Sequence, residues 1–183
     1  MDRKTFLKTI AAAGAALPCL SFAAPSESGR CEKSDCMADA AAVRQFLSGF
    51  LVAEEHSLDR KTLAKLMAER GHACCRALTF RQDLITQSQG SVDKLIELMG
   101  KIVGAENCTR KGDTITLVYP VQQCVCGWSP KVAAPNPDDP WCDCSAANNQ
   151  FLFQTVSGGK VTVKVLESER RNGRPCRFQL QLG

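Results

Sequence analysis

The chain has 183 residues, of which 44% are hydrophobic, and a formal net charge of +4 at pH 7. This length and composition fit one domain with a sizeable core. The charge is small and no basic block is present, so the sequence gives no support to nucleic-acid binding. The eleven cysteines make sulfur chemistry the main functional question.

The first residues predict an exported protein. A basic start at residues 2–8 precedes an apolar run at residues 9–17 and the small residues Ser21-Phe22-Ala23. This order is typical of a signal peptide cleaved near Ala23, and the run is too short for a transmembrane anchor. Residues 3–8 are similar to a twin-arginine signal whose second arginine is lysine, which leaves the twin-arginine and general secretory routes open. We expect a periplasmic or otherwise extracytoplasmic location.

This signal divides the chain into a signal peptide (1–23), a flexible lead-in (24–37) and a single α+β cysteine-rich domain (38–183). Cleavage removes Cys19 and leaves ten of the eleven cysteines. An even number of cysteines is what paired sulfurs require in an exported chain.

The first half of the domain has helical spacing of apolar residues, from Met37 to about Val103. One helix is expected from Leu58 to about Gly71. A second helix is expected from Val92 to Val103, with Ser91 as its N-cap and Gly104 at its end. These apolar stripes are typical of a core.

The second half changes to strand spacing. Residues 113–119 alternate and are rich in β-branched side chains, which predicts a strand. Ser145 is a suitable cap for a helix from Ala146 to Val156, which Gly158 closes. Helices followed by strands predict an α+β fold, in which N-terminal helices pack on a C-terminal antiparallel sheet and a helix is followed by a β-hairpin.

The last segment predicts that hairpin. Asn172-Gly173 supplies the two positive-φ positions of a type I′ turn, in a register that pairs Val165 with Leu180. Glu167 and Glu169 then fall on the inner face, where a carboxylate is either a rim residue or a pocket acid with a raised pKa. The same face carries the apolar residues of both strands, Val161, Val163, Val165, Phe178, Leu180 and Leu182.

Paired cysteines at both ends of a proline-rich stretch are the strongest chemical signal. Alternate residues of an extended strand point the same way, so each Cys-x-Cys offers two sulfurs to one face. Trp128 and Trp141 would screen the resulting site. Four thiolates at one point favour a metal site, with zinc ahead of an iron-sulfur cluster. Alternatively, the cysteines form two disulfides, each joining one Cys-x-Cys pair to the other. The expected ligands are Cys124, Cys126, Cys142 and Cys144.

The sequence therefore predicts an exported metal- or small-molecule-binding domain with a four-cysteine site, zinc being preferred. Two enzyme alternatives remain open. One is a hydrolase that uses Glu167, and the other is a thiol–disulfide enzyme that uses Cys74 and Cys75. A cysteine nucleophile with His72 as its base is a further candidate, but two residues apart on one helix is poor geometry for that proton transfer. A third alternative is a binding protein whose cysteines are all disulfide staples.

The C-terminal third also resembles a known family. A helix, Gly158-Gly159, a strand from Val161 and a glycine-containing turn lead to Cys176-Arg177-Phe178. This order resembles the end of the 4-vinyl reductase domain, which likewise finishes with a helix and a hairpin ending in Cys-x-Phe. It is also similar to the L-2-amino-thiazoline-4-carboxylic acid hydrolase family and to an exported, cysteine-rich group related to both. The resemblance covers residues 115–182 and implies an α+β fold among small-molecule or metal-sensing and adaptor domains. It transfers no catalytic motif beyond Cys176.

Overall fold

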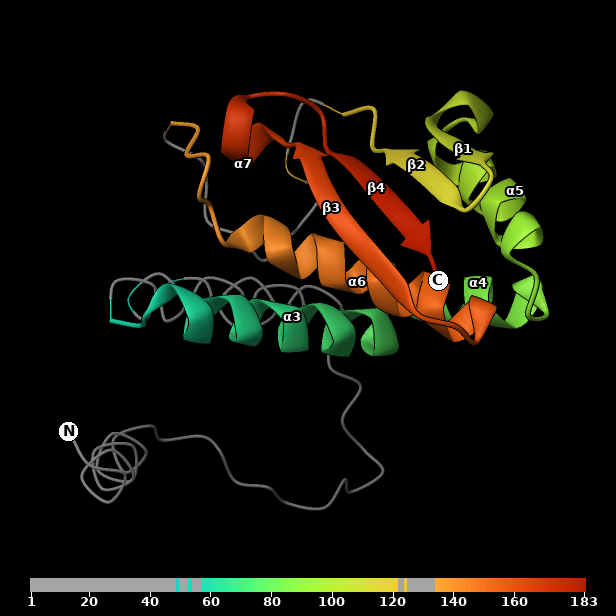
Figure 1. Cartoon of the computed structure of the whole chain (residues 1–183), viewed down its shortest axis with the longest axis horizontal. Coiled ribbons are helices and arrows are strands. Elements are labelled where there is room, and N and C mark those ends of the chain that lie inside the picture. Colours follow the sequence, from blue (N-terminus) through green and yellow to red (C-terminus); the bar gives the residue numbers. More distant parts are fainter. Residues whose placement is uncertain (1–48, 50–52, 54–56, 122–123, 125–133) are drawn as a thin grey trace, which may run out of the picture. The chain divides into compact units, whose positions relative to one another are not determined.

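Helices come first and a four-stranded antiparallel sheet follows in the computed structural model, which describes residues 49, 53, 57–121, 124 and 134–183 (Figure 1). All these residues belong to one compact unit, 41–183. The predicted signal peptide and lead-in lie outside the described residues. The expected α+β class is confirmed. No described helix has the length and apolar character needed to span a membrane. The elements in chain order are α3 (Arg60–Ala77), α4 (Thr79–Ser88), α5 (Val92–Val103), β1 (Cys108–Lys111), β2 (Thr114–Val118), α6 (Trp141–Ser157), β3 (Val161–Glu167), α7 (Glu169–Asn172) and β4 (Arg177–Leu182).

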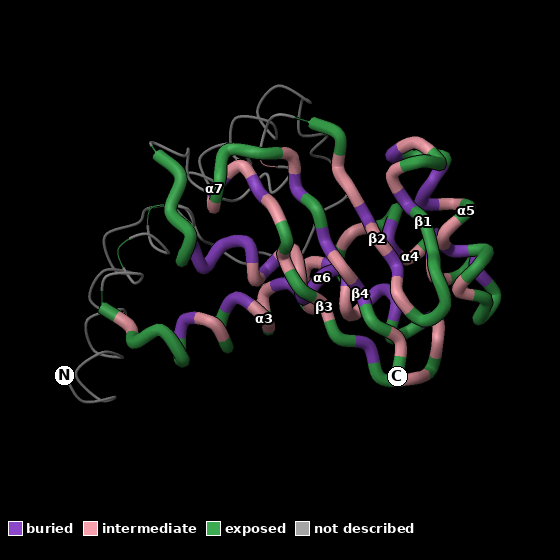
Figure 2. Tube along the Cα trace, turned by 45° about the horizontal axis from the view of Figure 1, so that its top comes forward, coloured by how far each residue is buried: buried purple, intermediate pink, exposed green. Residues whose placement is uncertain are grey.

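The sheet, α6 and α3 lie in successive layers (Figure 1). The strand order is β1-β2-β4-β3, and every neighbouring pair is antiparallel. One side of α6 packs on the sheet and α3 runs along its other side, while α4 and α5 lie toward the β1 edge. Buried and more exposed residues alternate along β2 and β4, as expected for a sheet with one face on the core (Figure 2).

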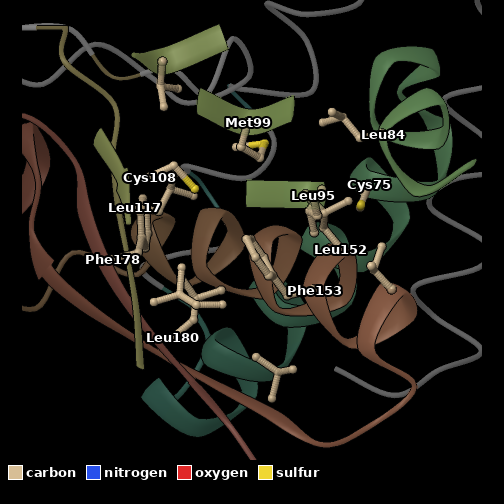
Figure 3. Close-up of a cluster of buried hydrophobic side chains, with 14 of the residues drawn as sticks. Cys75, Leu84, Leu95, Met99, Cys108, Leu117, Leu152, Phe153, Phe178 and Leu180 are labelled. Carbon is tan, nitrogen blue, oxygen red and sulfur yellow. The ribbon is translucent and has the colours of Figure 1, made fainter. Parts of the chain in front are cut away.

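The main core fills the space between α6 and the sheet (Figure 3). Leu152 and Phe153 of α6 are fully buried there, against strand residues that are equally inaccessible. Each such side chain contributes about 1.5–3 kcal/mol through removal of apolar surface from water. The residues that the helix and the strands bring together include Leu117, Leu152, Phe153, Phe178 and Leu180.

The helix caps agree with the sequence in α5 and differ in α3. The Ser91 hydroxyl accepts a hydrogen bond from the Lys94 amide at 3.3 Å, and Gly104 ends α5, as predicted. In contrast, α3 does not stop near Gly71 but continues to Ala77. A Cβ on Gly71 would lie 2.3 Å from the Cys144 carbonyl oxygen, so this glycine serves the close approach of α6 rather than a helix end.

The C-terminal hairpin is present, but its turn differs from the prediction. Ser168 caps the single-turn helix α7, and Gly173 (φ 69°) ends it. Among the described residues outside glycine, only Gln89 has a positive φ, so Asn172 cannot belong to a type I′ turn. This longer turn shifts the register by two residues and pairs Val165 with Phe178. A two-residue shift keeps the same side chains on the inner face, so the predicted apolar face is correct.

Candidate functional site

The site lies where α6 begins. This helix starts at Trp141, so Cys142 and Cys144 are helical rather than extended. Asp139 accepts a hydrogen bond from the Trp141 amide at 2.9 Å, and Pro140 adopts helical angles that its ring favours at a helix start. Successive helical residues are rotated by about 100°, so side chains two positions apart point to nearly opposite sides of the helix. The prediction that Cys142 and Cys144 share one face is therefore wrong.

Cys144 faces α3 and belongs to a small apolar cluster. It is 3% exposed and packs with Leu63, Met67 and Trp141. Nη1 of Arg70 lies 3.7 Å from its sulfur, and the same guanidinium stacks over the Trp141 ring at 5.1 Å. This sulfur therefore serves the contact between α3 and α6.

Cys142 faces α7 instead. Its thiol donates a hydrogen bond to the Ser168 hydroxyl at 3.1 Å, in a buried setting. Burial raises the pKa of Cys142, while the Ser168 hydrogen bond and the charge of Arg171 act to lower it. Negative charge on Asp139 and on a Cys124 thiolate adds to the rise in the pKa of Cys142.

Cys176 is another buried thiol, directly before β4. Burial raises the pKa of Cys176 to about 11, and the charges of Cys124 and Cys142 add to the rise. Cys124 follows β2, and its backbone amide donates a hydrogen bond to the Glu169 carboxylate. Three segments of the chain thus bring Cys124, Cys142 and Cys176 around α7. We call these residues the thiol group.

A buried ion pair supports the thiol group. Arg170 is 6% exposed and Asp139 is 7% exposed. Nε of Arg170 donates to both Asp139 carboxylate oxygens at 2.9 Å, and Nη2 lies 2.9 Å from one of them. Burial acts to lower the pKa of Arg170, but the Asp139 contacts outweigh it and the pKa of Arg170 is raised. This pair fixes α7 against the start of α6.

A second arginine extends this support. Nη2 of Arg171 donates to the Asp139 carbonyl at 3.0 Å and to the Asp143 carboxylate at 2.7 Å. The sequence indicated neither arginine contact, because the partners are distant in the chain. The only local signal was Asp-Asp-Pro-Trp, whose acidic residue and proline suit a helix start.

Glu167 is not a pocket acid. Its carboxylate pairs with Arg174 and with Arg177, each at 2.9 Å. The Arg174 hydrogen bond is the main cause that lowers the pKa of Glu167, and the charge of Arg177 adds to it. The alternative of a raised pKa is therefore wrong, and Glu167 is an ionised rim residue.

The other catalytic candidates lie inside α3, near its end. The Cys75 sulfur is fully buried in the apolar core (Figure 3), and burial raises the pKa of its thiol. Cys74 is half-buried. The His72 ring packs on Phe151 with 5.5 Å between centroids. A buried thiol with a raised pKa is a poor nucleophile near neutral pH, so the geometry gives the thiol-enzyme alternative little support.

The predicted four-cysteine zinc site stays a prediction. Cys126 and Trp128 lie outside the described residues. Within the described part of the chain, no three His, Cys, Asp or Glu side chains already form a group that could hold a metal ion. No disulfide joins two cysteines of that part either.

Comparisons with known proteins add no relatives. The chain matches no family model, no curated protein and no solved structure. The resemblance to the 4-vinyl reductase domain and to the L-2-amino-thiazoline-4-carboxylic acid hydrolase family therefore stays a prediction. A function has to be argued from the chemistry of the site.

Proposed function

We propose that the protein binds a thiol-seeking metal ion, zinc first, at the start of α6. The observation that carries the proposal is that Cys124, Cys142 and Cys176, from three segments of the chain, each contact α7 or its cap residue Ser168. Thiolates are among the preferred protein ligands of zinc, and structural zinc sites use three or four of them.

The proposed ligand set differs from the one expected from spacing. Cys176 takes the place of Cys144, because Cys144 packs toward α3 while Cys142 contacts Ser168 on the other side of α6. Cys126 is proposed as the fourth ligand. The described cysteines do not lie close enough together to hold a metal ion as they stand. Binding therefore requires their sulfurs to move toward the ion.

The electrostatics of the thiol group make such binding dependent on pH. Burial raises the pKa of both Cys142 and Cys176, so both are thiols near neutral pH. A metal ion displaces their protons, and each displaced proton makes the apparent affinity rise about tenfold per pH unit. Arg171, whose charge lowers the pKa of Cys142, favours the thiolate form that the metal requires.

A binding role in an extracytoplasmic compartment fits the other predictions. The N-terminal sequence is typical of a signal peptide. The resemblance to small-molecule and metal-sensing domains favours binding over catalysis. The ion-paired state of Glu167 and the burial of Cys75 agree with this preference.

The test combines metal analysis with a matched pair of variants. The protein is purified from the extracytoplasmic fraction, its zinc content and accessible thiols are measured, and zinc affinity is determined by competition with a chromophoric chelator. Cys142→Ser should weaken zinc binding by about 10- to 100-fold, because it removes a ligand. Cys144→Ser removes an equally buried sulfur two residues away and should change the affinity less than about twofold if only the α7 side binds metal.

Two results would overturn the proposal. One is an equal loss of affinity in the two variants. The other is a protein without zinc and without reactive thiols, which would support the disulfide-stapled alternative.

A further inference from the structure

Arg81 is a buried arginine that is not one of the thiol-group residues. It belongs to α4 and is 6% exposed. Its Nη2 donates to the Tyr119 hydroxyl at 2.8 Å and to the Asn149 side-chain oxygen at 3.3 Å, and its Nη1 lies 3.7 Å from the Met99 sulfur. The Tyr119 hydroxyl also donates to Asn149 at 2.9 Å. Every partner of this guanidinium is thus electrically neutral.

The charge of Arg81 has no acidic partner in the part of the chain that the structure describes. No carboxylate among the described residues pairs with it, and its buried Nε–H has no acceptor. An arginine side chain keeps its proton in proteins, so the positive charge persists on burial. Arg170 is equally buried, but its charge is balanced by a bidentate contact with the Asp139 carboxylate. A buried charge without a counter-ion is strongly unfavourable.

We propose that Arg81 anchors a monocarboxylate ligand with an apolar body. One guanidinium balances one negative charge, and its planar fork of N–H donors matches the two oxygens of a carboxylate. The unpaired Nε–H supplies a donor that no protein group uses. Apolar side chains surround the charge, since Met99 lies on one side and the Phe80 ring lies 5.1 Å from the guanidinium carbon.

Phe80 also offers a route from solvent. Its side chain is 48% exposed although it stacks on the buried guanidinium of Arg81. The proposal includes a turn of this exposed ring away from the guanidinium, after which an apolar ligand body contacts the ring. The proposal uses none of the residues of the thiol group and does not depend on metal binding.

The experiment measures the melting temperature of the full-length protein with octanoate, octan-1-ol or acetate. Octanoate has both the carboxylate and the apolar body, whereas each of the other probes lacks one. At a hundredfold excess over its Kd, octanoate should raise the melting temperature by about 5 °C, and the other two probes should have little effect. Arg81→Met should abolish the octanoate shift. The control variant Arg110→Met removes a guanidinium that already pairs with Asp93 and Asp113, and it should keep the shift.

The unliganded variants separate a ligand anchor from a structural arginine. Because Arg81→Met removes an uncompensated buried charge and keeps the hydrogen bond between Tyr119 and Asn149, it should melt at or above the wild-type temperature. Tyr119→Phe keeps the ring that packs on Phe178, and it should weaken octanoate binding about tenfold through loss of one hydrogen bond that orients Arg81. The proposal is overturned if octanoate has no effect on the wild type, if octan-1-ol acts equally, or if the shift survives in Arg81→Met.

Discussion

The two ends of α6 are held in different ways. Its second half buries Leu152, Phe153 and Val156 against the sheet, whereas its first turn is fixed by the Asp139–Arg170 ion pair and by Cys142. Apolar contacts are non-directional and tolerate many partners. Charge-assisted hydrogen bonds need particular donors and acceptors at fixed positions. The polar end therefore specifies which chain segments meet, and this is why it brings chemically useful side chains together.

Breaking the ion pair tests this difference most strongly. Asp139→Ala leaves Arg170 buried without its counter-ion, and should lower the free energy of unfolding by about 3–5 kcal/mol. Urea unfolding followed by circular dichroism measures the loss. Arg174→Ala is the control, because it breaks an ion pair whose arginine side chain is 68% exposed, and it should have a far smaller effect. Comparable losses in the two variants would mean that the buried pair does not fix this end of α6.

The close contact between α3 and α6 lies between the two ends of α6 and depends on Gly71. A Cβ there would lie 2.3 Å from the Cys144 carbonyl oxygen and 2.9 Å from the Asn148 amide nitrogen, and backbone atoms cannot move aside cheaply. Gly71→Ala should therefore destabilise the protein by about 3 kcal/mol. Gly49→Ala is the matched control, since a Cβ at that position meets nothing within 4 Å. Its free energy of unfolding should stay the same or rise by up to about 1 kcal/mol through better helix propensity.

Cys108, a buried thiol of the main core, gives the smallest expected change in the free energy of unfolding. Burial raises the pKa of Cys108 to about 11, from an ordinary value of 9.0. The folded state then holds this proton more tightly than the unfolded state, so stability is complete below pH 9 and falls as the pH rises toward 11. The loss due to this thiol should be about 2 kcal/mol.

The measurement for Cys108 compares the wild type with Cys108→Ala by urea unfolding at pH 8 and pH 10.5. The variant should show a smaller decrease between the two pH values, because the titrating thiol is gone. This comparison cancels the titration of lysine and tyrosine side chains, which both proteins share. Equal decreases would show that Cys108 titrates alike in the folded and unfolded states.

Local signals explain which parts of the fold were predictable. Both caps of α5 are residues of the helix ends themselves, Ser91 and Gly104, and the prediction was correct there. The alternation of β2 and the apolar face of the hairpin were also correct. β1 was missed, because its four residues bury only Cys108 and so show no alternation. The hairpin turn was wrong, because the capping of α7 by Ser168 outweighed the Asn-Gly preference.

The site was less predictable than the fold. Spacing indicated Cys124 and Cys142, but the assumption of an extended arm placed Cys144 beside them, where the helix turns it away. The sequence did not place Cys176 beside Cys124 and Cys142. Nothing local indicates that Arg170 pairs with Asp139, since the contact joins residues 31 positions apart. Long-range polar pairing depends on the assembled fold, so spacing along the chain could not predict it.

The shortness of α7 has a consequence for the stability of the first turn of α6. With four residues it is below the length at which a helix persists alone. It is tied to the segment before α6, because the Asn136 amide donates to the Arg170 carbonyl at 2.7 Å and Asp139 binds the same residue. Each segment therefore gains from the other the order that it lacks alone. If the two segments separate, Cys142 loses its contact with Ser168 and its burial, so the rate at which this thiol is oxidised reports how often this end of α6 opens.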